Sequence, residues 1–513
     1  MIFQGSKSAR PTGDLALLAG LAAAKLVLHL LVAHRYGYFR DELYFIDCSK
    51  HLDWGYVDLP PLVPAITRLV HDSLGDSLTA LRFVPALAGA LKVILAGLIA
   101  RELGGNRFAQ ALAAVAVLVA PGYLAADHLL TMNALEPVFW TSCGLVFIRL
   151  VKTGNPRLWI WFGILAGLGL ENKYSMLLFG LGFVAGLMLT RQRRLFLNRW
   201  IWLGAAAALV IFLPNLLWEI HHHFPTLQFL SYHRVSPTNV PLTPLAFLAE
   251  QILDLQPLTC LIWMAGLWYY LGSREGEPYR ALGWTYIVML FLLLVLRGRT
   301  YYLLPAYPLL LGSGAVFVEK ALTPPRWVWA RVAYLAVLAL GGAFLAPFAL
   351  PVLPVTAYVK YSKSLNLDPP AIENRKLGKL PQLYADTFGW KEMAAATARV
   401  YYTLPTAERE QTAIFANDYG EAAAIDFFGP AYRLPEAISP HQNYFLWGPR
   451  NYTGQSIILL GHNPTLEKQC SAEEQLGFVE HEYAMPYESF PILLCHDLRN
   501  PLKQVWSDLK RWE

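Results

Sequence analysis

Residues 38–45 read YFRDELYF, and the polar segment continues to residues 54–62, which read WGYVDLPPL. Asp41 and Glu42 are adjacent carboxylates just after the first long apolar run, Asp58 follows about one short helix later, and aromatic side chains surround all three. A partly desolvated carboxylate has a raised proton affinity, which suits a general base. The alternative is a helix start, with acids near its positive end, followed by a Pro-Pro turn. The stretch alone leaves both interpretations open.

The composition indicates a polytopic membrane protein. Of 513 residues, 55% are apolar and only 15% are charged, whereas a soluble domain carries roughly 25% charged residues. Basic residues fall in short turns between apolar runs rather than in a stripe, so we expect no nucleic acid partner. The five cysteines show neither CxxC pairing nor zinc-type spacing. Cys470 and Cys495 lie in the polar tail and would be free to pair if that tail faces an oxidising compartment.

Apolar runs long enough to cross about 30 Å of hydrocarbon as helices recur along the chain. The first covers residues 14–34 and predicts an uncleaved span with its N-terminus inside. Lys25 and His29 interrupt it four residues apart, and we expect them to face other helices or to snorkel. Residues 35–77 form the first outer loop and predict two short interfacial helices. We expect about eleven spans in all, the others at 78–100, 108–127, 132–152, 157–172, 174–190, 200–218, 245–271, 280–296, 303–319 and 328–350.

The placement of basic residues supports this topology. Alternate connections share an excess of lysine and arginine, namely Arg101/Arg107, Lys152/Arg157, Arg191/Arg193/Arg194/Arg199, Arg274/Arg280 and Lys320/Arg326/Arg331. The opposite connections carry acids, histidines and aromatic residues instead. By the positive-inside rule the first set lies in the cytoplasm, and with an odd number of spans the polar tail lies outside. We therefore predict a multi-pass membrane protein whose polar tail lies outside.

The tail predicts a soluble α/β domain, so the chain divides into a membrane domain, residues 1–354, and an extracytoplasmic domain, residues 355–513. Residues 417–420 read NDYG, which is a turn signal. Periodicity predicts helices at 390–404 and 421–428 and strands at 411–417, 456–460 and 490–495.

Five connections on the outer side hold polar groups of the kind that is costly near a membrane and therefore marks function. The first holds Asp41, Glu42 and Asp58. In the second, Asn133 and Glu136 lie one turn apart, although helix capping by Asn133 would also explain them. In the third, Lys173 and Tyr174 follow an acid and an amide, and a simple polar turn is the alternative.

The fourth and fifth connections add histidines, arginines and tyrosines. His221, His222 and His223 do not share a helical face, so a metal site built from them alone is not expected; one histidine, His233, joining Asp58 on a divalent ion is more reasonable. The fifth connection reads RGRTYYLLP at 297–305. An arginine beside paired tyrosines at the membrane surface is suited to bind a lipid phosphate. The alternative is that these residues only anchor the chain at the membrane interface.

These sets offer carboxylates for base chemistry, cations for an anion and a candidate metal site at one membrane face. This combination fits the transfer of a group from a lipid-linked phosphate. The base removes a proton from an acceptor hydroxyl, and the cations stabilise the charge that develops on the phosphate leaving group.

At these residues the chain resembles the lipid-linked-sugar glycosyltransferases of the GT-C fold. It is similar to the family 39 branch, which holds protein O-mannosyltransferases and aminoarabinose transferases of lipid A. The resemblance covers residues 35–310 and rests on RDELY at 40–44 with YVDLPPL at 56–62; KY at 173–174 and RTYY at 299–302 are similar to later motifs. It implies Asp41 as the catalytic base and associates Asp58 with a divalent metal (Mg, Mn, Ca or Zn).

The chain departs from the family pattern at two positions. Asn133 stands where many members carry an acid, and Leu59 stands where a lysine often precedes the Pro-Pro pair. We therefore expect phosphate binding to depend more heavily on Lys173, Arg234 and Arg299.

The sequence predicts an inverting membrane glycosyltransferase that uses a polyprenyl-phosphate sugar and an acceptor at the outer face of the membrane. Asp41 is the expected base with Glu42 beside it, and Asp58 and His233 are expected to hold a metal or to orient the acceptor. The resemblance implies the bacterial cytoplasmic membrane, with the tail on the periplasmic side. The expected substrate- and phosphate-binding residues are Tyr44, Tyr56, Asn133, Glu136, Lys173, Tyr174, Arg234, Arg299, Tyr301 and Tyr302. A transporter or lipid flippase is the alternative, but it would place charge near mid-membrane on broken helices. A membrane scaffold that presents the tail is a second alternative.

Overall fold

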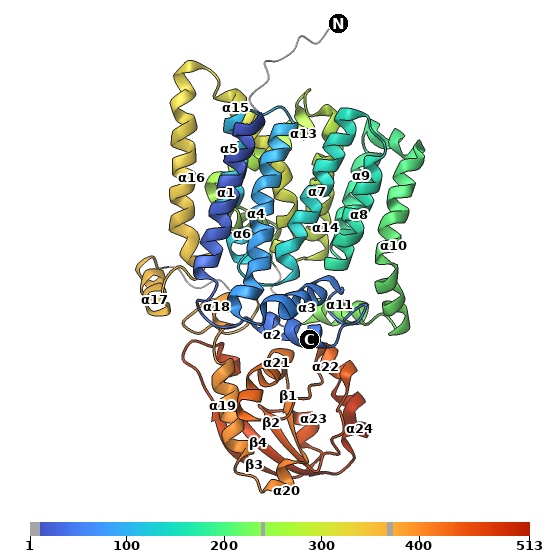
Figure 1. The fold of residues 1–513 in the computed structure, drawn as a ribbon, viewed down its shortest axis with the longest axis vertical. Coiled ribbons are helices and arrows are strands. Elements are labelled where there is room, and N and C mark those ends of the chain that lie inside the picture. The colour runs from blue at the N-terminus through green and yellow to red at the C-terminus, as the bar shows by residue number, and fades with distance from the viewer. Residues whose placement is uncertain (1–10, 237–241, 367–372, 513) are drawn as a thin grey trace. The chain divides into compact units, whose positions relative to one another are not determined.

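The computed structural model describes residues 11–236, 242–366 and 373–512, and in it the chain forms two compact units (Figure 1). The helical unit holds residues 1–33, 82–216 and 241–352. The mixed unit holds residues 34–81, 217–240 and 353–513. The last segment of the mixed unit starts close to the boundary predicted at residue 354. The first outer loop and the segment 217–240, however, pack with this C-terminal part rather than with the spans.

Each predicted apolar run is helical. Seven helical stretches of the described residues are long and apolar enough to cross a membrane by themselves: α1 (Pro11–Val32), α4 (Leu78–Glu102), α7 (Met132–Thr153), α10 (Arg199–His221), η3 (Glu277–Tyr279) with α14 (Arg280–Leu296), η4 (Thr300–Ala306) with α15 (Tyr307–Ala321), and η5 (Pro325–Trp327) with α16 (Val328–Ala349). Three further apolar helices are shorter, namely α5 (Arg107–Val119), α8 (Leu158–Asn172) and α9 (Met176–Met188). A short helix, η1 (Arg191–Leu197), links α9 to α10. The protein is therefore a polytopic helical membrane protein.

Two runs predicted as single spans are broken. The run at 245–271 divides into α12 (Pro244–Asp254) and η2 (Pro257–Thr259) with α13 (Cys260–Gly272), which meet at an angle of 99°. Gln256 has a φ of 73° at this bend, and Pro257 after it has no backbone N–H to continue the helix. The run at 108–127 divides at Pro121 into α5 and α6 (Pro121–Ala126) for the same reason.

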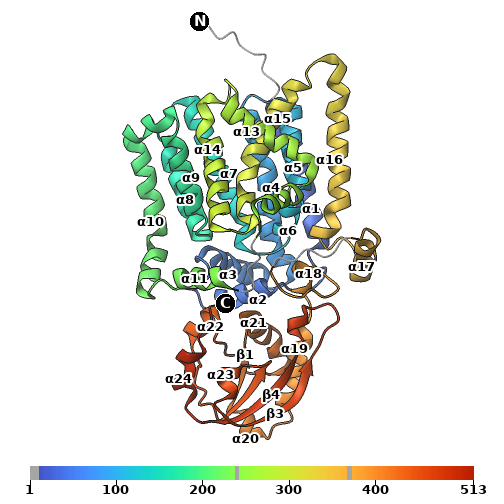
Figure 2. The same cartoon turned by 180° about the vertical axis from the view of Figure 1, so that it is seen from behind.

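Glycines bring neighbouring helices of the helical unit close together. A Cβ atom at Gly314 would lie 1.8 Å from the carbonyl oxygen of Ile262, so only glycine permits this approach of α15 to α13. Gly163 and Gly204 play the same part between α8 and α10. Close backbone approach at small residues is the usual way that helices associate in membranes. Figure 2 shows α8, α9 and α10 side by side at one edge of this unit.

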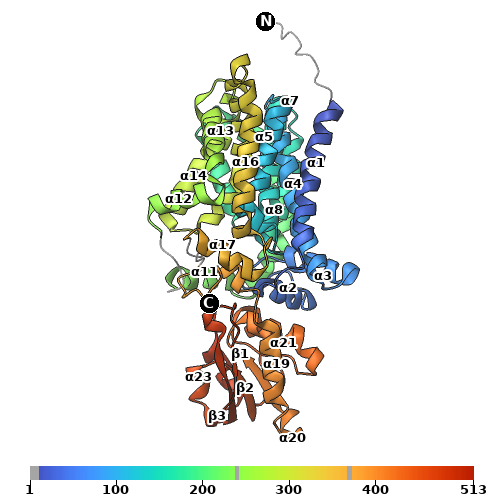
Figure 3. The same ribbon diagram turned by 90° about the vertical axis from the view of Figure 1, so that its left-hand side faces the viewer.

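The mixed unit contains a four-stranded sheet in the order β1-β2-β4-β3. The strands are β1 (Thr412–Ala416), β2 (Ser456–Leu460), β3 (Cys470–Val479) and β4 (Phe490–Leu498). β1 and β2 are parallel, with Ile414 opposite Ile458, and the other two pairings are antiparallel. Every residue of β1 and β2 is buried, which explains their continuous apolar runs. Figure 3 shows α19 (Trp390–Tyr401) and α21 (Tyr419–Phe428) on one face of this sheet.

The sequence missed β3 and misassigned the NDYG segment. β3 is an edge strand with acidic, exposed residues, so it lacks a strong apolar signal. The turn predicted at 417–420 is a helix start, because the Asp418 side chain accepts a hydrogen bond from the Gly420 N–H and caps α21. A disulfide joins Cys470 in β3 to Cys495 in β4.

Short helices complete the mixed unit. The first outer loop forms α2 (Arg40–Lys50) and α3 (Leu62–Leu74), as predicted. The others are α11 (Pro225–Val235), α17 (Val355–Ser364), α18 (Gln382–Ala385), α20 (Thr406–Arg409), η6 (Gly429–Tyr432), α22 (Gln442–Trp447), α23 (Pro464–Glu467), η7 (Pro486–Glu488), α24 (Leu502–Val505) and η8 (Trp506–Leu509).

Candidate functional site

Asp41 is the second residue of α2 and lies in a polar cluster of the mixed unit. Its side chain is 28% exposed, and its Oδ1 accepts a hydrogen bond of 2.7 Å from the Tyr419 hydroxyl. The Arg40 Nε lies 3.7 Å from the same oxygen. Burial raises the pKa of Asp41, while Arg40 and Tyr419 partly oppose that rise. A carboxylate that is reachable and has a raised pKa is suited to accept a proton.

Arg40 fixes the start of α2 within this cluster. Its guanidinium lies 3.1 Å from a carboxylate oxygen of Glu373 and 3.6 Å from one of Asp386. Three carboxylates therefore share one arginine. Burial raises the pKa of Asp386 to about 6, although the Arg40 charge opposes that rise.

Asp58 is held by hydroxyl and amide donors. The Tyr44 hydroxyl donates to Asp58 Oδ1 over 2.9 Å. With its amide nitrogen turned toward the carboxylate, Gln442 donates to Oδ2 and Oδ1 at 2.9 and 3.0 Å. Asn443 donates to the Tyr44 oxygen over 2.5 Å and accepts from the Val57 N–H over 3.1 Å. Burial raises the pKa of Asp58 to about 7, the Tyr44 bond opposes the rise, and the nearby Asp41 charge adds to it.

The groups that bond the Asp58 carboxylate are a hydroxyl and an amide. Across residues 11–236, 242–366 and 373–512, no group of three or more His, Cys, Asp or Glu side chains is placed to hold a metal. The His233 ring stacks on Phe229 with 5.8 Å between centroids. The side chain of Arg234 falls outside the described part of the chain. The metal expected at Asp58 and His233 stays a prediction.

Two residues predicted for the site have local structural partners. Glu42 is fully buried, and its Oε2 accepts a hydrogen bond of 2.9 Å from the Phe39 N–H at the start of α2. The Tyr56 hydroxyl donates to the carbonyl oxygens of Cys48 and His51, each over 3.1 Å. Glu42 thus bonds the backbone at the N-terminus of α2, and Tyr56 holds the loop after α2 against the end of that helix.

Lys173 is the centre of a second polar cluster, in the helical unit. Its Nζ donates to Asn133 Oδ1 over 2.6 Å and lies 3.1 Å from Glu136 Oε2. It also lies over the rings of Tyr302 and Tyr301, at 4.6 and 5.2 Å from their centroids. The structure thus brings together five residues that the sequence singled out from three separate connections. A lysine held in place at the end of apolar helices is a candidate to bind an anion.

The capping alternative for Asn133 is wrong. Thr131 is the N-cap residue of α7, so Asn133 lies within the first turn and directs its amide oxygen to Lys173. Glu136 also accepts a hydrogen bond from the Ser175 hydroxyl, a residue that the sequence did not single out. Tyr174 donates to Asn215 over 3.0 Å, and Arg299 is the residue that precedes η4, the segment carrying Tyr301 and Tyr302.

A third polar cluster is sealed inside the helical unit. Lys25, Lys92 and Asp127 have no exposed side-chain surface. Lys25 Nζ lies 3.1 Å from Asp127 Oδ2, and Lys92 forms an ion pair with Oδ1 of the same carboxylate. The cluster joins α1 and α4 to the residue after α6, and it explains why Lys25 interrupts an apolar run.

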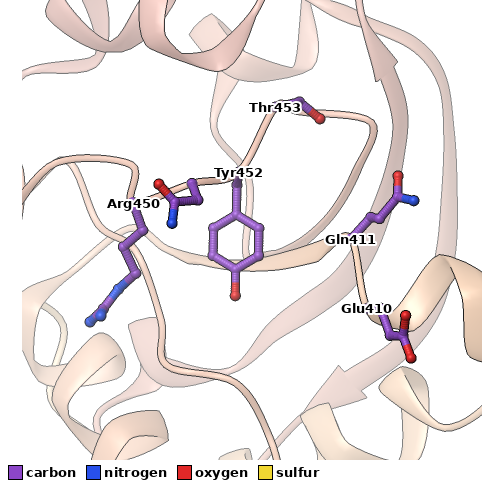
Figure 4. Close-up of a pocket in the computed structure, with 6 residues that line it drawn as sticks. Glu410, Gln411, Arg450, Tyr452 and Thr453 are labelled. Carbon is purple, nitrogen blue, oxygen red and sulfur yellow. The ribbon is translucent and has the colours of Figure 1, made fainter.

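A surface pocket of about 510 Å³ lies elsewhere in the mixed unit (Figure 4). Its lining residues include Gln411, just before β1, and Tyr452, in the loop before β2. Asn417 and Tyr419 follow the opposite end of β1. None of the residues predicted for the site lines this pocket, so its size does not make it the candidate site.

Comparison with known proteins gives one family model. Residues 58–218 match the family described as "Dolichyl-phosphate-mannose-protein mannosyltransferase". The match covers the end of the first outer loop and the helices from α4 to α10. It includes Asp58, Asn133, Glu136 and Lys173 but begins after Asp41.

Two curated relatives come from Rhizobium johnstonii. The chain is 30% identical over 210 residues to the lipopolysaccharide core galacturonosyltransferase RgtB, and the aligned part is 40% of this chain and 42% of RgtB. It is 24% identical over 195 residues to the lipid A galacturonosyltransferase RgtD, over 37% of this chain and 40% of RgtD. The chain thus matches less than half the length of these relatives.

Two solved structures are similar over most of the chain. ArnT from Cupriavidus metallidurans bound to undecaprenyl phosphate has a TM-score of 0.60 at 17% identity, covering 94% of this chain and 98% of ArnT. The oligosaccharyltransferase of Archaeoglobus fulgidus has a TM-score of 0.50 at 14% identity, covering 83% of this chain and 65% of that one. At these identities the likeness shows the fold, and the predicted GT-C fold is confirmed.

Proposed function

We propose that this chain, a membrane protein of the GT-C glycosyltransferase fold, transfers a sugar from a polyprenyl-phosphate donor to an acceptor hydroxyl, with inversion. The observation that carries the proposal is the position of Asp41. It is a partly exposed carboxylate with a raised pKa, held by Tyr419 on one oxygen. The helical unit, taken by itself, offers in Lys173 a cation suited to a phosphate group.

The base step follows from the hydrogen bonds of Asp41. Because Oδ1 accepts the Tyr419 hydroxyl, the proposal assigns the acceptor proton to Oδ2. The acceptor oxygen attacks the anomeric carbon of the donor as its proton moves to Asp41. The bond from that carbon to the phosphate oxygen breaks, and its electron pair leaves with the polyprenyl phosphate. Attack opposite the leaving group inverts the anomeric configuration.

Within the helical unit, Lys173 is proposed to bind a phosphate group of the lipid donor. Its side chain is 13% exposed, and Glu136 and Asn133 hold the ammonium group in one orientation. A preorganised cation in a poorly hydrated place stabilises developing negative charge without reorganising. Arg299, beside the two tyrosines in sequence, is proposed to bind the same phosphate.

The comparisons support the choice of substrate class. ArnT of Cupriavidus metallidurans binds undecaprenyl phosphate, and the two rhizobial relatives act as galacturonosyltransferases on lipopolysaccharide core and lipid A. We therefore propose a donor built on a polyprenyl phosphate and an acceptor saccharide of the bacterial outer envelope. The proposed location is the cytoplasmic membrane with the site on the periplasmic side, where the disulfide between Cys470 and Cys495 would persist.

Incubation of the purified full-length protein with radiolabelled donors tests the proposal. The donors are undecaprenyl phosphates carrying galacturonic acid, aminoarabinose or mannose, and the acceptors are lipid A, lipopolysaccharide core and membrane protein. We expect label in one lipid or saccharide fraction and release of undecaprenyl phosphate in equal amount. No transfer from any of these donors, in protein that still binds undecaprenyl phosphate, would contradict the proposal. A parallel incubation with EDTA tests the expected metal.

A further inference from the structure

Asp41 and Asp58 of the first outer loop both lie beside residues from far along the chain. Tyr419, which bonds Asp41, is 378 residues away in sequence. Asn443, which bonds Tyr44 beside Asp58, is 399 residues away. Gln442 lies next to Asn443 and donates to Asp58 itself. Two helix starts of the C-terminal segment, those of α21 and α22, therefore meet the two carboxylates.

The backbone around Tyr419 gives its hydroxyl a fixed direction. Asp418 caps α21, with Glu421 completing the capping box, so Tyr419 is the first residue of that helix. The Tyr419 N–H donates to His441 Nδ1 over 3.2 Å. The Tyr419 ring packs at 4.8 Å from the ring of Tyr44. A capped backbone and a packed ring leave the hydroxyl little freedom other than to face Asp41.

Gln442 is held in an unusual backbone conformation. Its φ is 47°, a left-handed value that costs free energy for a residue other than glycine, and its side chain is buried. Its N–H donates to the Arg511 carbonyl oxygen over 3.1 Å, near the end of the chain. The fold thus maintains strain at the residue whose amide faces Asp58.

We infer that Tyr419 is a positioning residue for Asp41 and Gln442 for Asp58, so that the C-terminal segment is a part of the catalytic centre rather than a separate acceptor-binding module. This inference rests on the proposed function in taking Asp41 as the base. A hydrogen bond to Oδ1 orients the carboxylate and presents Oδ2 to the acceptor. Because the bond favours the charged form, it also keeps Asp41 ionised over a wider range of pH.

Other charged groups face Asp41 and are unchanged by a substitution at Tyr419. They come from α2, the first outer loop, the segment before α18, the end of α18 and the cap of α21, and they are Arg40, Asp58, Glu373, Asp386 and Asp418. The Tyr419→Phe variant removes only the hydroxyl and retains the ring that packs on Tyr44. Its effect therefore reports the hydrogen bond.

The first measurement needs no transfer activity. A water-soluble carbodiimide modifies protonated carboxyl groups, and mass spectrometry of the peptide containing Asp41 gives the extent of modification at each pH. In Tyr419→Phe we expect the pH of half-maximal labelling to rise, because the charged form of Asp41 has lost a donor. A hydrogen bond to a charged group corresponds to about tenfold or more in an equilibrium constant, so the rise should be about 1 pH unit. Tyr401→Phe is the matched control, since that hydroxyl donates to the Arg409 carbonyl oxygen in the same unit.

The second measurement uses the donor and acceptor found for the full-length protein. Tyr419→Phe should lower kcat about tenfold with KM little changed, and should move the acidic limb of kcat/KM to higher pH. Gln442→Ala should lower kcat and leave the labelling of Asp41 unchanged. If the Tyr419→Phe variant has the same pH profile of labelling and the same kcat as the wild type, the inference is overturned. An active Asp41→Asn variant would instead refute the proposed base, and the labelling comparison would still report whether Tyr419 holds Asp41.

Discussion

Asp41 and Asp127 both follow an apolar segment and both lie beside cations, yet their surroundings differ. The Asp41 side chain is 28% exposed, with a tyrosine hydroxyl at 2.7 Å and a guanidinium nitrogen no closer than 3.7 Å. The Asp127 side chain has no exposed surface and lies between the ammonium groups of Lys25 and Lys92. One carboxylate is open to a substrate, and the other is closed by its own partners.

This difference indicates that access of substrate to the carboxylate, rather than its charge, distinguishes a general base from an acid that only links helices. A general base must come within hydrogen-bond distance of the proton that it removes. Asp127 cannot do this, because lysines occupy its surroundings and the cluster excludes water. Its ion pairs instead join α1, α4 and the residue after α6, where an unpaired charge would be costly.

The largest effect is expected at the open carboxylate. Asp41→Asn keeps the shape of the side chain and removes its ability to accept a proton, so transfer should fall by about 10³-fold. Expression, the melting temperature and binding of undecaprenyl phosphate should stay near those of the wild type. Initial rates with the labelled donor measure the loss, and a variant that retains a tenth of the activity would remove Asp41 from the role of base.

At the closed carboxylate the expected loss is in stability. Asp127→Asn leaves Lys25 and Lys92 buried without a countercharge, which should cost about 3–5 kcal/mol. Thermal melts of the purified protein in detergent measure the change. Asp72→Asn is the control, because Asp72 is 52% exposed in a surface pair with Arg68 and should change stability by less than about 0.5 kcal/mol. Equal melting temperatures for the two variants would show that the sealed cluster does not link the helices.

A smaller effect should follow from the pH dependence of Asp58. Its folded-state pKa is about 7, whereas that of an unfolded aspartate is about 3.9. Between these values the folded state binds more protons than the unfolded state, so its contribution to stability is present below about pH 4 and is lost as the pH rises through 7. Asp58→Asn should therefore melt a few degrees higher than the wild type at pH 8 and show no gain at pH 4. A gain of equal size at both values would contradict the raised pKa.

The smallest effect is expected when the whole sealed cluster is replaced. The triple variant Lys25→Met, Lys92→Met, Asp127→Leu removes all three charges and leaves none unpaired. Replacement of a buried ion cluster by apolar residues is often neutral or stabilising, so stability should stay within about 1 kcal/mol of the wild type. Transfer activity should also be retained, since the three side chains have no exposed surface that a substrate could reach. A triple variant as inactive as Asp41→Asn would place the sealed cluster in the reaction.

Several features of the site were predictable because they depend only on residues that are close together in the sequence. The apolar runs predicted the apolar helices of the helical unit, though not the short basic helix η1, and the RDELY and YVDLPPL motifs indicated the GT-C fold. Asn133, Glu136, Lys173 and the tyrosines were singled out as polar groups at helix ends, and the structure joins them. Tyr419 lay within a segment noted for its turn signal, but nothing local to it indicates Asp41 as its partner. Gln442 carries no sequence signal, because its role depends on a strained backbone conformation and on Asp58.

The sequence by itself determined the helical membrane class, the α/β character of the tail and the set of polar residues from which a site is built. Those properties follow from the period of apolar residues and from the cost of charge in hydrocarbon, both of which are local. Only the tertiary structure decided which acids are open and which are closed by lysines. It also decided that the first residues of α21 and α22 form hydrogen bonds with Asp41 and Asp58. Such pairings depend on residues several hundred positions apart, which meet because burial of apolar surface fixes where each polar group ends.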